Sequence, residues 1–228
     1  MRTIPSEAAF YLANTGWLSR IPKAFQDEIL DACLCYELDP GQAIAHGGDE
    51  SGGMFGIVSG AACVYSAVGS SDGPLIHIAG AAFWFGIFPV TNGQPRMISV
   101  TAQTRCQVAR MPQAALQSLL ERKPEMWRWL SLLSLESARL AVQALADVLI
   151  RDNERRCAAV LLRVAGCREC GDQPASAILT QDDLAALSNL SRPTVSLVLR
   201  HLAERGLISL GYRAITLQAP AKLRHFVG

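Results

Sequence analysis

The clearest hydrophobic pattern of the chain lies in its C-terminal quarter. The stretch LTQDDLAALSNLSRPTVSLVLRHLAERGLI, residues 179–208, has apolar positions at helical spacing in two short runs with a turn between them. The pattern predicts two crossed helices whose buried faces are formed by Leu184, Leu187, Val195, Val198, Leu199 and Leu202.

Polar residues at the ends of these runs predict where each helix begins. Thr180 is a good N-cap, and Asp183 three residues later resembles a capping box. Asn189 stands in the turn and tolerates a positive φ better than any residue except glycine. Ser191 then caps the second helix, and Pro193 falls in its first turn, where a missing N–H costs nothing.

A hairpin follows the helix pair. Gly206 is a typical helix stop, and the runs LISL and AITL flank Gly-Tyr-Arg at 211–213. Two crossed helices and a hairpin wing together predict a winged helix-turn-helix.

The second helix of this unit carries the side chains that a DNA reader needs. Such a helix enters the major groove with its N-terminal residues against the base edges. Arg192 can donate two parallel hydrogen bonds to guanine O6 and N7, whereas Arg200 and Arg213 are better placed for phosphates. The alternative is a winged helix used for protein contacts. The predicted DNA-binding residues are Thr180, Ser191, Arg192, Pro193, Thr194, Ser196, Arg200 and Arg213.

The preceding part of the chain has a different pattern. Residues 1–40 predict amphipathic helices, and from residue 41 to about residue 111 glycines separate short apolar runs. In MISVTA, Ile98 and Val100 alternate with Ser99 and Thr101, the two-residue period of a strand. We expect a compact all-β sandwich or roll here.

A long helix is predicted after Pro124, because well over 25 residues follow without glycine or proline. It offers an apolar stripe that one helix cannot bury alone, which favours pairing with a second copy. A second register, which runs through Ala141 and Val148, is rich in small residues. The alternative is a core helix packed on its own β domain. The predicted dimer stripe consists of Leu130, Leu133, Ser137, Leu140 and Ala144.

Composition and charge agree with a folded protein that can contact nucleic acid. The chain of 228 residues is 50% hydrophobic and 18% charged, with a formal net charge of +1. Residues 172–228 hold six Lys/Arg against four Asp/Glu, which permits contact with DNA. No N-terminal signal is visible, and charged residues interrupt the apolar stretch 127–150, so it is a poor membrane span. We therefore expect a cytoplasmic protein.

Taken together, these elements resemble the Crp–Fnr superfamily of bacterial transcription regulators. Residues 179–208 are similar to the family pattern T-x-x-(D/E)-L-A-x-x-x-G-x-S-R-x-T-V-S-x-x-L-x-x-L-x-x-x-G-L-I. The resemblance implies an α+β fold with an N-terminal double-stranded β-helix (a cupin-like β-roll), a long dimerisation helix and a C-terminal winged helix-turn-helix. The expected boundaries are residues 1–122, 123–151 and 152–228.

The same resemblance implies a function. Members act as homodimers on pseudo-palindromic double-stranded DNA, and activators contact RNA polymerase. Asn189 replaces the usual Gly, a tolerable exchange at a turn. Two departures matter: Pro193 and Leu197 stand where the family often has Glu and a second Arg. Arg192 is therefore the only family-type base reader left, and we expect a half-site unlike that of the cyclic-AMP-responsive members.

The effector region departs further from the family pattern. Members that bind cyclic nucleotides have Gly-Glu in a phosphate loop and Arg-Ser or Arg-Thr about ten residues later. In FWFGIFPVTNGQPRM the arginine is present, but the hydroxyl residue and the glutamate are missing. We predict a regulator that cyclic AMP does not control, with either an apolar pocket or a filled one. The candidate pocket residues are Phe85, Gly86, Arg96, Met97, Ala141 and Val142.

The chain has seven cysteines, which we expect to be ordinary reduced thiols. Cys167 and Cys170 have CxxC spacing, but a zinc site needs about four ligands and the histidines show no matching spacing. Iron–sulfur relatives hold several N-terminal cysteines, whereas only Cys33 and Cys35 lie early here. We predict no metal, no cofactor and, with no catalytic constellation in the sequence, no enzyme. The alternative function is a small-molecule or redox sensor that acts through protein–protein contacts.

Overall fold

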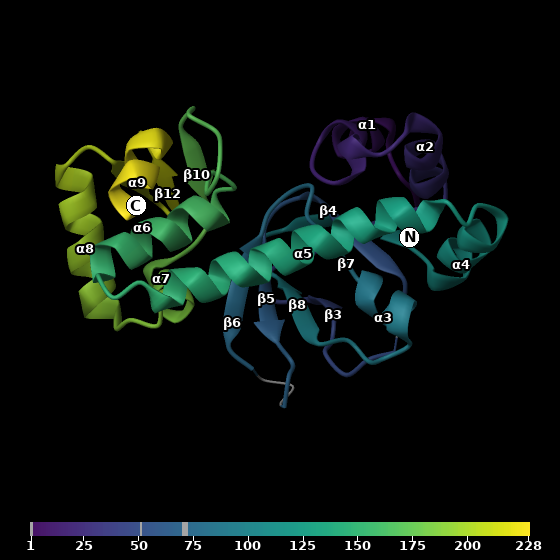
Figure 1. Ribbon diagram of the computed structural model, residues 1–228, viewed down its shortest axis with the longest axis horizontal. Helices are drawn as coiled ribbons and strands as arrows, with labels where there is room; N and C mark the ends of the chain where they lie inside the picture. The colour runs from purple at the N-terminus through teal and green to yellow at the C-terminus, as the bar shows by residue number, and fades with distance from the viewer. Residues whose placement is uncertain (1, 51, 70–72) are drawn as a thin grey trace. The chain divides into compact units, whose positions relative to one another are not determined.

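The computed structural model describes residues 2–50, 52–69 and 73–228 (Figure 1). They form two compact units, Met1–Gly73 with Ala79–Arg139, and Pro74–Ile78 with Leu140–Gly228. This division cuts the long helix in its middle, whereas the sequence suggested a separate helix between residues 123 and 151. The expected three-part boundaries stay a prediction.

The first unit begins with helices, as the sequence predicted. Strand β1 (Arg2–Thr3) leads into α1 (Ser6–Asn14), the 3₁₀ helix η1 (Leu18–Arg20) and α2 (Lys23–Asp31). These helices share a hydrophobic core with strands of the β domain. Leu12, Trp17 and Ile29 are fully buried in it. The indole N–H of Trp17 donates to the carbonyl of Trp129 at 2.9 Å.

The expected β-roll is present as two antiparallel sheets. One has the order β1-β2-β9-β4-β7 and the other β3-β8-β5-β6. Phe55, Ile57, Val64 and Val108 bury their side chains in a second core cluster formed by residues of both sheets. The strands are β2 (Leu34–Leu38), β3 (Ala43–Ala45), β4 (Met54–Ser59), β5 (Ala62–Ser66), β6 (Leu75–Ala79), β7 (Trp84–Phe85), β8 (Ile98–Ala102) and β9 (Cys106–Met111).

Three helices follow the strands within or after the roll: α3 (Ile87–Asn92), α4 (Gln113–Arg122) and α5 (Met126–Leu149). The first half of α5 packs inward, because Met126, Leu130 and Leu133 are buried in the core of the first unit. The predicted dimer stripe is therefore wrong at Leu130 and Leu133. Periodicity showed an apolar stripe on α5 but not which surface would cover it.

A different face of α5 remains exposed. Leu135, Ala138, Val142, Leu145 and Leu149 are all exposed and follow one another at intervals of three, four, three and four residues. That is the heptad spacing of a coiled-coil seam. Ser137, Leu140 and Ala144 of the predicted stripe are only half-buried and lie on the opposite side of the helix. The sequence missed this seam because the stripe through Leu130 has the same period.

The second unit is a winged helix-turn-helix, as predicted, with α6, α7, α8 and α9 around a small sheet (Figure 1). Its sheet has the order β10-β12-β11, and β11 and β12 form the antiparallel wing. The elements are α6 (Asn153–Val164), β10 (Ala175–Ala177), α7 (Gln181–Ser188), α8 (Arg192–Glu204), β11 (Ile208–Gly211), β12 (Ala214–Leu217) and α9 (Pro220–Val227).

The longest helix, α5, contains most of the apolar stretch 127–150 that the sequence analysis weighed as a membrane span. It carries Arg128, Glu136, Arg139 and Asp147 along its length. Across the part of the chain that the structure describes, no helix combines the length and the apolar character needed to cross a bilayer.

Candidate nucleic-acid interface

The turn between α7 and α8 has the geometry that the sequence predicted. The Thr180 hydroxyl accepts from the Asp183 backbone N–H at 3.1 Å, and the Asp183 carboxylate accepts from the Thr180 N–H at 2.8 Å. Asn189 ends α7 with φ 51° and ψ 50°, the left-handed conformation that asparagine tolerates. The two hydrogen bonds fix where α7 begins, and the left-handed conformation of Asn189 ends it before α8.

The start of α8 is held as firmly. The Ser191 hydroxyl accepts from the backbone N–H of Thr194 at 3.3 Å, and the two hydroxyl oxygens are 2.8 Å apart. Pro193 occupies the first turn of the helix, where proline suits the helix start. Because Ser191 and Thr194 satisfy each other, the structure gives them a capping role in the unbound protein.

One face of α8 is buried and the opposite face is open. The inner face buries Val195, Val198, Leu199 and Leu202. Ser196 and Thr194 are half-buried at its edges. The residues exposed along the outer side are Arg192, Pro193, Leu197 and Arg200.

Arg192 has a partner that the sequence did not predict. Its Nε lies 3.3 Å from a carboxylate oxygen of Asp182 on α7, and the side chains are 68% and 67% exposed. An ion pair so exposed contributes little to stability. The ion pair uses Nε, so the other two nitrogens of the guanidinium can still donate hydrogen bonds to guanine O6 and N7. In the sequence, Asp182 stood out only as a favourable charge in the first turn of α7.

The wing lies beside the start of α8 and completes a concave surface. A hollow of about 350 Å³ is lined by residues from the start of α7, from α8 and from the wing, including Asp182, Arg192 and Arg213. Arg213 has φ 52° at the wing tip, and the neighbouring Tyr212 is 93% exposed. Sequence reasoning missed Tyr212, whose only signal was its place between the two predicted strands of the hairpin.

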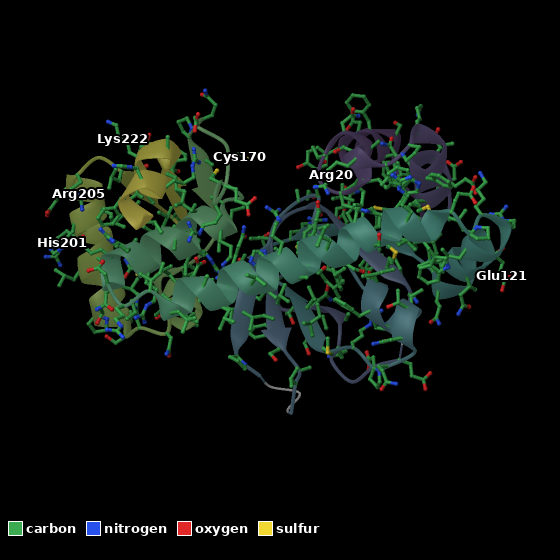
Figure 2. The ribbon with its side chains drawn as sticks, viewed as in Figure 1. Arg20, Glu121, Cys170, His201, Arg205 and Lys222 are labelled. Atoms are coloured by element: carbon green, nitrogen blue, oxygen red, sulfur yellow. The ribbon has the colours of Figure 1, made fainter. Side chains whose placement is uncertain are left out.

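The second half of α8 is tied to α6 instead. His201 Nδ1, near the end of α8, lies 2.8 Å from a carboxylate oxygen of Glu154, and Arg205, which caps the helix, lies 3.5 Å from the other (both are labelled in Figure 2). The Arg205 guanidinium also stacks over Phe226 at 4.5 Å from the ring centroid. These contacts give Arg205 a structural partner on each side, whereas Arg200, one turn earlier, is exposed.

In the first unit, three of the predicted effector-pocket residues lie together. Arg96 is buried, donates to the carbonyl of Gly53 at 3.0 Å and lies over the Phe55 ring at 5.1 Å from the centroid. Phe85 stacks on Phe55 with ring centroids 5.2 Å apart. Gly86 has φ +100°, and a Cβ there would approach the Gly53 carbonyl oxygen to 2.5 Å. The loop that the family uses for phosphate is therefore packed against its own backbone.

A second arginine joins this cluster. Arg110 donates to the carbonyl of Gly52 at 3.1 Å and lies 5.7 Å from the Phe55 centroid. Burial lowers the pKa of Arg96, and the charge of Arg110 acts in the same direction while Asp49 opposes it. The sequence did not single out Arg110, because alternation along β9 marks it only as an outward polar residue.

The remaining predicted pocket residues are exposed. Met97 follows Arg96 but its side chain is exposed. Ala141 and Val142 belong to the second compact unit and are also exposed. Val142 lies instead on the exposed seam of α5.

The cysteines are free thiols, and most are buried. Burial raises the pKa of Cys33 to about 12 and that of Cys157 to about 11, so the reactive thiolate is disfavoured near neutral pH. Cys167 is buried and its pKa is also raised by burial, whereas Cys170 is exposed (Figure 2). No group of three or more His, Cys, Asp or Glu residues within the described ranges is arranged to hold a metal ion.

Comparisons with known proteins match both parts of this architecture. Residues 36–123 match the cyclic nucleotide-binding domain family, and residues 155–226 match the Crp-like helix-turn-helix domain family. The CRP-like cAMP-activated global transcriptional regulator of Mycobacterium tuberculosis is 28% identical over 200 residues, which are 84% of this chain and 89% of that protein.

Solved structures share the fold. FixK2 from Bradyrhizobium japonicum superposes with a TM-score of 0.72 at 18% identity, covering 86% of this chain and 98% of that one. A CRP/FNR-family transcriptional regulator from Thermus thermophilus gives 0.63 at 20% identity, covering 85% and 98%.

A cyclic nucleotide-binding-type domain together with a Crp-like helix-turn-helix defines a class of transcription regulators. The chain belongs to the Crp–Fnr family. It is a Crp-like transcriptional regulator with a DNA-binding helix-turn-helix, as the sequence pattern predicted.

Proposed function

We propose that the protein is a homodimer that binds a two-fold symmetric DNA site, with Arg192 of each copy reading a guanine in the major groove. The observation that carries the proposal is the exposed guanidinium of Arg192 at the start of a helix with a capped N-terminus and a buried inner face. A bidentate arginine–guanine contact contributes about 1–3 kcal/mol of discrimination between bases.

The other predicted DNA-binding residues divide by what they offer. Arg200 and Arg213 are exposed cations on α8 and at the wing tip, suited to phosphates. Ser196 is half-buried and within the groove-facing half of α8. Thr180, Ser191, Pro193 and Thr194 act by shaping and capping the two helices that present these groups. The proposed activity is binding, and no chemical step is assigned to the chain.

The test begins with selection of bound fragments from genomic DNA by the purified protein. We expect a two-fold symmetric consensus, and Arg192→Ala should relax preference at one base pair in each half-site while weakening operator binding. Arg200→Ala should instead weaken binding to all duplexes alike and reduce its salt dependence.

Lys222→Ala is the matched control, because it removes one positive charge from α9 of the same unit, outside the proposed interface. It should leave the consensus unchanged. An unchanged consensus with Arg192→Ala would refute the role of that residue. If the wild-type protein retained no duplex at moderate salt, the result would refute DNA binding and favour the alternative function, a sensor that acts through protein contacts.

We also propose that the exposed seam of α5 is the dimer interface. The seam exposes large apolar side chains in a heptad pattern, and their exposure to water is unfavourable. These side chains are Leu135, Val142, Leu145 and Leu149. Two copies related by a two-fold axis would present two copies of Arg192 to the two halves of a palindrome. If the protein activates transcription, RNA polymerase is the expected further partner.

Cyclic AMP is not the proposed effector, although the mycobacterial relative is described as cAMP-activated. Support comes from Arg96, whose guanidinium already donates to Gly53 and packs on Phe55. No carboxylate in Phe85-Gly86-Ile87 is available for a ribose hydroxyl. Unpaired polar groups in a bound nucleotide would each cost about 1–3 kcal/mol.

Isothermal titration of the full-length protein with cyclic AMP tests this directly. We expect no heat of binding at millimolar nucleotide and no change in operator affinity. Saturable binding that Arg96→Ala abolishes would overturn the independence from cyclic AMP, without affecting the proposal for DNA.

A further inference from the structure

The outer face of α8 carries an exposed apolar side chain. Leu197 is 48% exposed although the other leucines and the valines of the helix are buried. Pro193, Leu197 and Arg200 follow one another at intervals of four and three residues, so they share one face of the helix. This face is opposite the buried stripe of Val195, Val198, Leu199 and Leu202.

An exposed leucine by itself is common on protein surfaces. Leu197 differs because it lies between two exposed arginines along α8: Arg192 begins the helix on an adjoining side, and Arg200 follows Leu197 one turn later on the same face. Glu204 ends the face with a negative charge, which phosphates would repel. The groove-facing part of α8 is therefore its first two to three turns, with Leu197 near their centre.

The major groove offers one apolar group on the base edges, the C5 methyl group of thymine. Resting on the proposed DNA binding, we infer that Leu197 is a specificity-determining residue that packs against a thymine methyl group in each half-site. Its side chain can neither donate nor accept a hydrogen bond, so it favours thymine over cytosine by contact alone. Pro193, one turn earlier, extends the same apolar surface without adding a donor.

The helix geometry also places this thymine relative to the guanine that Arg192 reads. The two residues are five positions apart, which is about 7.5 Å along a helix axis. Successive base pairs are about 3.4 Å apart. The two side chains also differ by about 140° around the helix, so the thymine should lie in the same half-site as the guanine, a few base pairs from it.

Replacing thymidine by deoxyuridine tests the contact, because it removes the methyl group and keeps the base pair. With the selected operator and wild-type protein, we expect deoxyuridine at one position per half-site to weaken binding about fourfold, and about fifteen-fold when both half-sites are changed. Leu197→Ala should bind the normal operator more weakly and be insensitive to deoxyuridine at that position. This loss of sensitivity shows that the side chain and the methyl group act on each other.

Two control variants separate the contact from general damage. Leu210→Ala shortens another exposed leucine, on the wing, and should keep the deoxyuridine effect. Arg192→Ala should lose guanine preference yet also keep that effect.

Two outcomes would overturn the inference while leaving the proposed function intact. One is a selected operator in which no deoxyuridine substitution weakens wild-type binding. The other is Leu197→Ala protein as sensitive to deoxyuridine as the wild type. If no duplex is selected at all, the proposed function itself fails, and the role of Leu197 fails with it.

Discussion

At the residue scale, the surroundings decide what identical side chains do. Arg192 begins α8 and Arg205 follows its last residue, yet Arg205 contacts both Glu154 and Phe226, whereas Arg192 has only the exposed pair with Asp182. Arg96 carries the family's phosphate-binding residue type but donates its hydrogen bond to Gly53. The sequence pointed to Arg192 and Arg96 but could not identify their partners, which belong to other elements of the fold.

His77 provides a test at this scale. It is buried, and its Nδ1 lies 3.2 Å from a guanidinium nitrogen of Arg163, whose other side binds Asp147. Burial, with the positive charge of Arg163, lowers the pKa of His77 to about 3 from the usual 6.5. Between these two values the unfolded chain binds a proton that the folded chain does not. The stability of wild-type protein should therefore fall as pH falls below about 6.5.

Urea unfolding at pH 7.5 and pH 5.0 measures this effect. The loss in unfolding free energy between the two pH values should be about 2 kcal/mol larger for the wild type than for His77→Gln. His225→Gln removes an exposed histidine from α9 and should retain the wild-type loss. Equal losses in wild type and His77→Gln would contradict the assignment of a neutral, buried imidazole.

At the element scale, the ends of helices followed from local sequence, but their packing did not. The caps at Thr180 and Ser191 and the left-handed turn at Asn189 use groups within four residues of each other. In contrast, Asp147 near the end of α5 is fully buried and receives hydrogen bonds from Arg163 on α6 at 2.8 Å and from Arg168 at 3.2 Å. Nothing in the spacing of these residues distinguishes them from solvent-exposed charges.

Removing one member of this buried ion pair should be costly. Arg163→Met leaves the Asp147 carboxylate buried with Arg168 as its remaining ionic partner, and we expect a loss of about 3 kcal/mol, the lower end of the range for breaking a buried pair. The double variant Asp147→Leu with Arg163→Met removes both charges and should recover much of that stability. Chemical denaturation of the three proteins makes the comparison. A double variant less stable than Arg163→Met would show that packing, not charge, dominates.

At the scale of the whole molecule, the long helix α5 has two roles on two faces. One face buries Met126, Leu130 and Leu133 in the core of the first unit. The other carries the exposed seam that we propose for the dimer. The sequence predicted that α5 pairs with a copy of itself, but a heptad stripe is compatible with both faces, and the surrounding core decides which is free.

Leu145→Glu tests the seam. It places a charge in the centre of the proposed interface in both copies, where burial without a partner costs several kcal/mol. We expect the dissociation constant of the dimer, measured by analytical ultracentrifugation, to rise more than about a hundredfold. Operator affinity should fall with it, since each half-site is then bound separately.

Phe10→Glu is the control for this variant, because it makes the same type of change at an exposed apolar residue on α1. It should leave both assembly and operator binding unchanged. A Leu145→Glu protein that stays dimeric would exclude the seam as the interface.

The sequence by itself determined what depends on neighbours along the chain. Helix periodicity, capping residues, the turn asparagine and the strand alternation all act within a few residues, and they were sufficient to predict the strand-rich first part of the chain and the winged helix, and to suggest Arg192 as a base reader. Only the tertiary structure decided which face of α5 is covered, that Asp182 approaches Arg192, that Asp147, Arg163 and His77 meet in a buried cluster, and that Leu197 remains exposed. Burial and ion pairing depend on residues brought together from distant parts of the chain, and a local sequence pattern does not specify those contacts.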